Sequence, residues 1–306
     1  MKLVRRAKGK IKREIKKFLN PVFGEILMLH SVVESRSRLI DNRMLEITPA
    51  FLEQTILKYK YAGYRFASLD DVQKQLKKRK RYWRKFVCFT LDDGYADNYK
   101  NAYPIFKKHN CPFAIYITTD YPDKNALYWW YQLEGVLLEN EQLTINGAEY
   151  DCSDLEKKNK AFRDIRDKIF SSEAEMTLIA LKQLYKDNDS AIRKDINELA
   201  LSWEQIVELA ADPLCTIAAH TVSHAALPVL NDEMIRKELS EGKNKIEERI
   251  KKPVKHFAYP YGNWDSRIAD LAKEQFCTAT TTDKGIVRKY DNIYMLKRNE
   301  LTHDLL

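Results

Sequence analysis

The chain has 306 residues, of which 44% are hydrophobic and 31% are charged, and its formal net charge is +8. These values are typical of a folded globular protein and exclude a disordered or fibrous chain. No stretch holds the ~18 consecutive apolar residues that a membrane-spanning helix requires, so the sequence predicts no such helix.

The first 17 residues are strongly basic, with nine Lys or Arg and one Glu. Within them apolar residues recur at helical spacing, which predicts a basic amphipathic helix over residues 1–20. A helix of this kind either lies on an anionic membrane surface or packs on the rest of the protein, and the sequence leaves both open. The apolar positions are Val4, Ala7, Ile11, Ile15 and Phe18.

The expected location of the protein is the cytoplasm. The basic N-terminus lacks the apolar core of a secretory signal peptide. The five cysteines are odd in number and widely spaced, which favours reduced thiols over a disulfide framework. If residues 1–20 bind lipid, the protein would be peripheral to the inner face of the membrane. A second basic run, over 77–85, predicts a solvated face. We expect no nucleic-acid partner, because no known binding motif accompanies that run.

After residue 20 the chain alternates short apolar runs with segments of helical period. The run 25–30 predicts a buried strand that ends on a polar residue. Residues 49–60 predict a helix that Thr48 caps, and residues 69–76 predict another.

The next region repeats the order strand, helix, strand. Residues 86–91 and 112–118 are apolar runs of strand length, and residues 97–109 between them have helical period. This alternation predicts parallel strands joined by helical crossovers.

Residues 120–200 break this rhythm. They begin with an aromatic cluster at 128–131 and continue with charged sequence of helical period, which predicts a helical insertion. The aromatic cluster either packs the insertion onto the rest of the protein or offers a stacking surface to a sugar. We favour the packing role.

The pattern resumes beyond the insertion. Four short apolar runs predict strands, and two charged segments of helical period predict the helices between them. The apolar runs of the chain tend to end on polar residues, as strands of a (β/α) barrel deliver side chains to one catalytic rim. The expected strands are 215–219, 257–259, 276–281 and 293–296, and the helices are 231–251 and 265–275.

Three segments combine residues that carry chemistry: Asp92-Asp93-Gly94, His220 to His224, and Pro260-Tyr261-Gly262. Adjacent carboxylates at a strand end are costly unless a cation lies nearby. Two His and one Asp make three metal ligands and leave a position for water, and the second carboxylate is then free to take a proton. Each segment alone is commonly a turn or a solvated loop. Their order, each at the end of a predicted strand, makes that reading much weaker.

These segments resemble the first three motifs of the polysaccharide deacetylases, the NodB-homology or carbohydrate esterase family 4 group. The resemblance covers roughly 25–62, 85–118 and 214–298, and leaves the insertion outside. It implies an α/β fold, a distorted (β/α) barrel of the NodB-homology type that binds one divalent metal, usually zinc. We therefore expect residues 21–306 to form the catalytic domain, with a helical insertion over about 120–200.

The resemblance also implies roles for particular residues. Asp92 would be the catalytic base, and Asp93, His220 and His224 would hold the metal. Tyr261 would lend its backbone N–H to the oxyanion.

The sequence departs from the family at two places. The family often has an Arg that contacts the catalytic Asp, and Ala258 stands at its position here, so Arg298 is a candidate substitute. The family's general acid is a His near the last strand. His303 matches the local string, but we favour His30, because it follows an apolar strand and would reach the barrel rim.

We expect Pro260, Tyr261 and Trp264 to contact the substrate, and for Trp264 packing and sugar stacking are equally favoured. The expected reaction is removal of an N-acetyl group from a sugar in a surface-glycan or lipid-linked glycan precursor, releasing acetate. The alternatives are an amidohydrolase acting on a non-sugar amide and an inactive homologue that only binds glycan.

Overall fold

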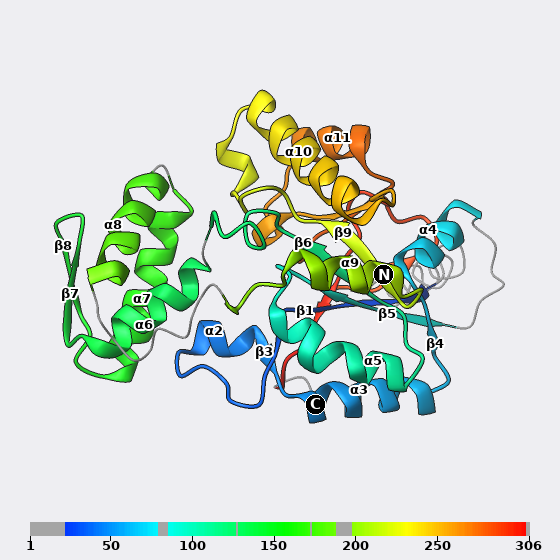
Figure 1. The fold of residues 1–306 in the computed structure, drawn as a ribbon, viewed down its shortest axis with the longest axis horizontal. Coiled ribbons are helices and arrows are strands. Elements are labelled where there is room, and N and C mark those ends of the chain that lie inside the picture. Colours follow the sequence, from blue (N-terminus) through cyan, green and yellow to red (C-terminus); the bar gives the residue numbers. More distant parts are fainter. Residues whose placement is uncertain (1–21, 79–84, 127, 172, 188–197, 304–306) are drawn as a thin grey trace, which may run out of the picture.

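The computed structural model describes residues 22–78, 85–126, 128–171, 173–187 and 198–303. The helix expected over residues 1–20 lies outside these ranges and stays a prediction. Among the helices of the described ranges, none combines the length and apolarity needed to cross a membrane. Figure 1 shows the arrangement of the elements.

The centre of the fold is a curved parallel sheet. Its strands lie in the order β1-β5-β6-β9-β10-β11, and each pairs with its neighbour in parallel register. Most of their residues are buried, which explains why these strands read as continuous apolar runs rather than alternating ones. Their bounds are β1 Val22–Leu29, β5 Phe86–Leu91, β6 Phe113–Ile117, β9 Cys215–Ala219, β10 His256–Ala258 and β11 Thr278–Thr280.

Residues 293–301 close this sheet into a ring. The backbone N–H of Leu296 donates to Ala279 in β11, and the N–H of Leu301 donates to Met28 in β1. Between these bonds, β13 (Asn299–Glu300) pairs in parallel with β1. The fold is therefore the expected distorted (β/α) barrel. The strand expected over 293–296 is wrong in detail, because the regular pairing falls at 299–300.

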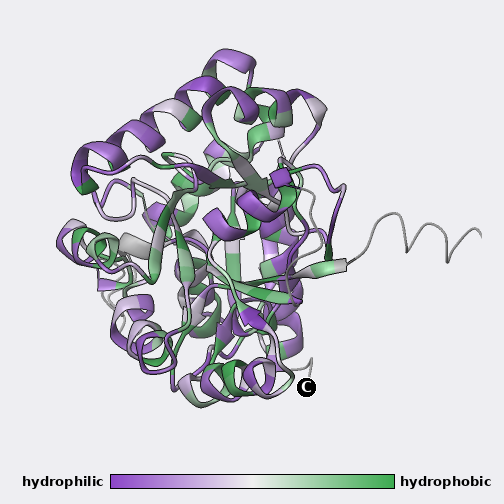
Figure 2. Ribbon diagram, turned by 90° about the vertical axis from the view of Figure 1, so that its right-hand side faces the viewer, coloured by the Kyte–Doolittle hydropathy of each residue, from purple (hydrophilic) through white to green (hydrophobic). Residues whose placement is uncertain are grey.

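Helices cover the outside of the barrel, and Figure 2 shows their hydrophilic outer faces around hydrophobic strands. Polar caps fix where several begin: Thr48 accepts from the Phe51 N–H, and Asp265 accepts from the Ile268 N–H. A π-helical turn, Asn98–Ala102, precedes α5 within the helix expected over 97–109. The helices are α3 Pro49–Tyr61, α4 Leu69–Lys78, α5 Tyr103–Lys108, α9 Trp203–Ala211, α10 Asp232–Ile250 and α11 Ser266–Gln275.

The insertion forms a lobe at one side of the barrel (Figure 1). It contains the expected helices, α6 (Trp129–Glu139), α7 (Leu155–Ile169) and α8 (Ala174–Asp187). It also contains a hairpin of β7 (Gln142–Ile145) and β8 (Ala148–Asp151), which the sequence reading missed. A second hydrophobic core, separate from that of the barrel, holds these elements together.

Shorter elements connect the larger ones. Of these, α2 and η4 bear on the site described next. They are β2 Ser31–Val32, α2 Ile40–Met44, β3 Glu46–Ile47, β4 Arg65–Phe66, η3 Leu227–Val229, η4 Pro260–Gly262 and β12 Val287–Arg288.

Candidate metal centre and catalytic pocket

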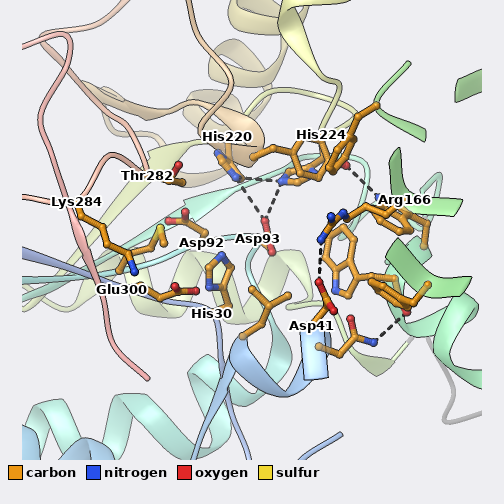
Figure 3. Close-up of a pocket in the computed structure, with 18 residues that line it drawn as sticks. His30, Asp41, Asp92, Asp93, Arg166, His220, His224, Thr282, Lys284 and Glu300 are labelled. Carbon is orange, nitrogen blue, oxygen red and sulfur yellow. Dashed lines mark hydrogen bonds and ion pairs between the residues drawn. The ribbon is translucent and has the colours of Figure 1, made fainter. Parts of the chain in front are cut away.

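A pocket of about 370 Å³ lies at the carboxyl ends of the barrel strands and faces the insertion. Its volume falls within the roughly 300–1,000 Å³ common for small-molecule sites. Figure 3 shows the side chains that line it. The residues at its base lie at or just beyond the carboxyl ends of β1, β5 and β9, so the strands bring together segments that lie far apart in the sequence.

The two carboxylates beyond the end of β5 meet different partners, Arg298 for Asp92 and the two imidazoles for Asp93, and the chain turns between them. The Asp92 N–H donates to the Leu29 carbonyl, which continues the pairing with β1. Asp93 and Gly94 then both adopt φ of 71°. A side chain at Gly94 would come within 2.9 Å of Ile117, so glycine is needed there for space as well as conformation.

The loop from His220 to His224 continues β9 and is held by α10. Glu238 accepts hydrogen bonds from the Val222 and Ser223 N–H groups and from the Ser223 hydroxyl. The loop contains two strained positions, Thr221 at φ 67° and His224 at φ 61°. Such conformations cost on the order of 1–3 kcal/mol each and cluster at functional sites. The loop geometry turns both imidazoles toward Asp93 (Figure 3).

Asp93, His220 and His224 form the only group of three potential metal-binding residues in the described ranges. The three ligand atoms lie within 4.8 Å of one another, and all three residues are buried. The Nε2 atoms of His220 and His224 are 3.4 and 3.1 Å from Asp93 Oδ1 and 3.2 Å from each other.

This donor set fits a divalent metal ion. The His220 Nδ1 atom is 2.8 Å from the Ala258 carbonyl, so Nδ1 carries the proton and Nε2 presents a lone pair to the centre. Asp93 Oδ1, which faces both Nε2 atoms, is buried with no hydrogen-bond partner among the described residues. Electron-pair donors that converge in a buried site need a cation between them.

The pKa shifts of Asp93 and His224 favour the protonation states that bind a metal ion. Burial raises the pKa of Asp93, but the neighbouring imidazoles outweigh burial and hold that pKa well below its usual value. Burial lowers the pKa of His224 and favours its neutral form. An ionised carboxylate with a neutral imidazole is the state that binds metal.

Asp92 does not join this group and instead pairs with Arg298. The guanidinium donates to both carboxylate oxygens of Asp92, at 2.6 and 2.7 Å, and is fully buried. The substitution of Ala258 for the family Arg is thus compensated from the closing segment of the barrel, as expected for Arg298. Burial raises the pKa of Asp92, but the Arg298 charge and hydrogen bonds more than offset it, so the pKa lies below its usual value.

The two candidate acids lie in different places. His30 lines the pocket with Asp92 and Asp93, on the side of Asp93 opposite the two metal-site imidazoles (Figure 3). His303 does not line this pocket. Its Nε2 accepts from the Thr48 N–H, and its ring packs 4.2 Å from the ring of Phe51.

Tyr261 forms part of the pocket wall, in a left-handed backbone conformation (φ 58°, ψ 5°). Its hydroxyl accepts from Trp129 Nε1 at 3.0 Å, and its ring lies 4.4 Å from that of His224. The structure does not bring Pro260 or Trp264 to the pocket lining. Pro260 is buried, and Trp264 packs against the barrel core, which matches the packing role rather than the stacking role.

The insertion supplies one wall of the pocket, a position that the sequence analysis considered only as the less favoured alternative for the aromatic cluster. Trp129 and Trp130 line the pocket, although most of their surface is buried in the insertion core. These two members of the aromatic cluster therefore pack the insertion and also face the pocket. The aromatic residues were the only available signal. Nothing local in the sequence marks the other lining residues, which are Met28, Asp41, Asn42, Leu45, Phe162, Arg166, Phe170, Thr282, Lys284 and Glu300.

The chain resembles known proteins in sequence and in fold. Residues 79–279 match the sequence model of the polysaccharide deacetylase family. A Bacillus subtilis (strain 168) protein named as a polysaccharide deacetylase, YxkH, is 30% identical over 92 residues, a match that spans 30% of each chain. Two solved structures share the fold. The Streptococcus pyogenes deacetylase PplD, in complex with acetate, has a TM-score of 0.64 at 19% identity, over 92% of this chain and 93% of that one. IcaB from Ammonifex degensii has a TM-score of 0.60 at 18% identity, with the same coverage.

Proposed function

Because the chain belongs to the polysaccharide deacetylase family, we propose that it is a metal-dependent carbohydrate N-deacetylase. The observation that carries the proposal is the convergence of Asp93, His220 and His224 beside an Asp92 that Arg298 keeps ionised. This set combines three metal ligands with a separate carboxylate, as hydrolysis of an amide requires.

Asp93, His220 and His224 would hold one divalent ion, for which two imidazoles and a carboxylate favour zinc. When bound, the ion supplies Lewis-acid chemistry, which polarises an amide carbonyl and acidifies water. The protein supplies the proton transfers around it.

In the proposed reaction, Asp92 takes a proton from a water molecule as that water adds to the acetamide carbon. The Tyr261 backbone N–H stabilises the oxyanion that develops on the carbonyl oxygen. His30 gives a proton to the sugar nitrogen as the carbon–nitrogen bond breaks, which releases acetate and a free amine. The position of His30 in the pocket supports it over His303 as the acid.

Acetate release tests the proposal. The purified protein, loaded with zinc, should release acetate from an N-acetylhexosamine glycoside and should not release it from simple acetamides that lack a sugar. Release from the non-sugar amides alone would favour the amidohydrolase alternative. Binding of the sugar without release would favour the inactive homologue. The intact Asp92–Arg298 pair supports an active enzyme, because a protein that only binds glycan has no need of a base.

Replacing His30 with Ala should lower turnover by about 10²–10⁴-fold, the usual cost of losing a general acid. Replacing His303 with Ala should leave turnover close to wild type, because that side chain contacts Thr48 and Phe51. Steady-state kinetics and the zinc content of both variants check this. A crippled His303→Ala beside a nearly normal His30→Ala would exchange the two roles.

The hydrogen bond from Trp129 in the insertion to the Tyr261 hydroxyl should hold Tyr261 in position for its contact with the oxyanion, and its loss should lower turnover. Either Trp129→Phe or Tyr261→Phe removes the bond and keeps an aromatic ring. We expect kcat to fall roughly threefold to tenfold in each, in line with about 1 kcal/mol for one hydrogen bond. KM should change less, because the oxyanion contact forms in the transition state. The double variant should be no worse than either single one, and additive losses would contradict the coupling.

The proposed substrate is a glycan precursor at the cytoplasmic face of the membrane. The five cysteines are all free thiols, four of them buried, which supports a compartment that keeps thiols reduced. The basic residues of segment 1–20 support a peripheral membrane contact, at about 1 kcal/mol per residue near an anionic surface. The full chain should therefore co-sediment with anionic vesicles in low salt, and a variant beginning at Pro21 should not. Equal pelleting would contradict the contact.

A further inference from the structure

The insertion is attached to the barrel rim by side-chain contacts at two separate points beside the pocket. At one point Arg166 in α7 forms an ion pair with Asp41 in α2, with Nη1 and Oδ1 2.8 Å apart. At the other, Trp129 in α6 donates to the Tyr261 hydroxyl, 3.0 Å away in η4. All four residues line the pocket (Figure 3).

Side chains of the insertion fill the space between these two points. The ring of Phe170 lies 4.5 Å from that of Tyr261, and the ring of Phe162 lies 6.2 Å from that of Trp129. Phe162 is almost fully buried, so it cannot swing aside without disturbing the insertion core. The contacts therefore form a continuous wall from α2 to η4, which we call the insertion wall: Asp41, Arg166, Phe162, Trp129, Phe170 and Tyr261.

The opposite rim is open by comparison. It consists of Thr282, Lys284 and Glu300, which follow β11 or lie in β13. Neither the Lys284 nor the Glu300 side chain makes a hydrogen bond or ion pair across the pocket in the part of the chain that the structure describes. Lys284 is exposed to solvent. A bound molecule can thus continue outward over this rim, whereas the insertion wall stops it on the other side.

An internal sugar of a polymer is linked on both sides, so it needs two exits from the site. A sugar at a chain end needs one. Resting on the proposed deacetylase function, we infer that the pocket accepts a terminal N-acetyl sugar, at one end of a glycan or on a short glycoconjugate, with the rest of the molecule leaving over the Thr282–Lys284–Glu300 rim. The interior residues of a polysaccharide are excluded by the insertion wall.

The position of the product amine tests this inference. An oligosaccharide series, from disaccharide to hexasaccharide, is built on the N-acetyl sugar from which the enzyme releases acetate. It is labelled at the reducing end and sequenced by tandem mass spectrometry after limited reaction. We expect one amine per chain, always at the same end, in more than about tenfold excess over internal positions, since wall contacts discriminate by sterics. Amines at internal positions in comparable amounts would overturn the inference.

A pair of variants tests the wall itself. Arg166→Ala combined with Phe170→Ala removes one attachment and one ring of the wall, and should raise the ratio of internal to terminal amine. Arg163→Ala is the matched control, because Arg163 also pairs with Asp41 at 2.9 Å but does not line the pocket. It should leave the ratio unchanged. A rise in the control as large as in the double variant would contradict a steric wall.

The total amount of acetate released distinguishes a failure of the terminal-sugar inference from a failure of the deacetylase proposal. Acetate released with internal amines refutes the terminal-sugar inference and leaves the deacetylase proposal standing. No acetate from any N-acetyl sugar refutes the deacetylase proposal, and the inference fails with it. Because the ratio is measured on wild-type protein first, the inference does not depend on whether the double variant folds.

Discussion

Replacing Asp92 with Asn should abolish turnover while the metal stays bound. Asn cannot accept the proton that Asp92 takes from water, and Asp92 pairs with Arg298 rather than with the group of three ligands. We expect a loss of at least about 10²–10⁴-fold in kcat, the usual contribution of a general base. Elemental analysis should still find one zinc per chain. Loss of zinc from Asp92→Asn, with retention in Asp93→Asn, would reverse the roles of the two carboxylates.

The same substitution should also destabilise the protein, which calls for a matched control. It leaves the Arg298 charge buried without its partner, and breaking a buried pair in this way costs about 3–5 kcal/mol. The double variant Asp92→Asn/Arg298→Met removes both charges and should recover part of that stability in denaturant unfolding. Its turnover should remain at the level of Asp92→Asn. Recovery of activity along with stability would mean that Asp92 serves the fold and not the reaction.

Replacing His220 with Ala should remove both the metal and the activity. His220 supplies one of three ligand atoms, and its Nδ1 bond to the Ala258 carbonyl orients the ring toward the centre. Changes to such orienting bonds alone cost about 10–100-fold in metal affinity, and loss of the ligand should exceed that. Turnover should fall below detection at zinc concentrations that saturate the wild type.

Thermal unfolding gives a readout of metal binding that does not depend on activity. A chelator should lower the Tm of the wild type, because a bound ligand at 100 times its Kd stabilises the native state by about 2.7 kcal/mol. The Tm of His220→Ala should not respond. His109→Ala is the control, since His109 pairs with Glu53 outside the pocket, and it should behave as the wild type does. A chelator response in His220→Ala equal to that of the wild type would remove His220 from the site.

The elements with a strong local pattern were predictable from the sequence. The strand over 86–91 was placed to the residue because all six positions are buried and five of them are apolar, Thr90 being the exception. Helix α3 was found from its Thr48 cap. Two misses had signals of the same kind. Ser202 and Gln205 form a capping box at the start of α9, and Asn146-Gly147 is the strongest short hairpin signal, with φ of 50° and 77°.

Some residues of the site could likewise be predicted from the sequence, and others could not. Arg298 was proposed because Ala258 stands where the family often has an Arg that contacts the catalytic Asp, and Arg298 lies near the last predicted strand. The insertion wall could not be found in this way. Arg166 and Asp41 are 125 residues apart, and nothing in the charged helix around Arg166 distinguishes it from its solvated neighbours. Their contact depends on how the insertion packs beside the barrel, which is a tertiary property without a local pattern.

The segment that closes the barrel also determines when the site is completed during synthesis. Asp92 precedes Arg298 by 206 residues, so a ribosome working at about 5–20 residues per second makes the carboxylate roughly 10–40 s before its counter-ion. Over that interval β1 has no β13 to pair with, and Asp92 has no guanidinium to hold it ionised in a buried site. On the proposed mechanism the nascent chain therefore lacks its paired base until the ring closes, and we expect proteolysis within residues 293–301 to lower the turnover of the finished molecule.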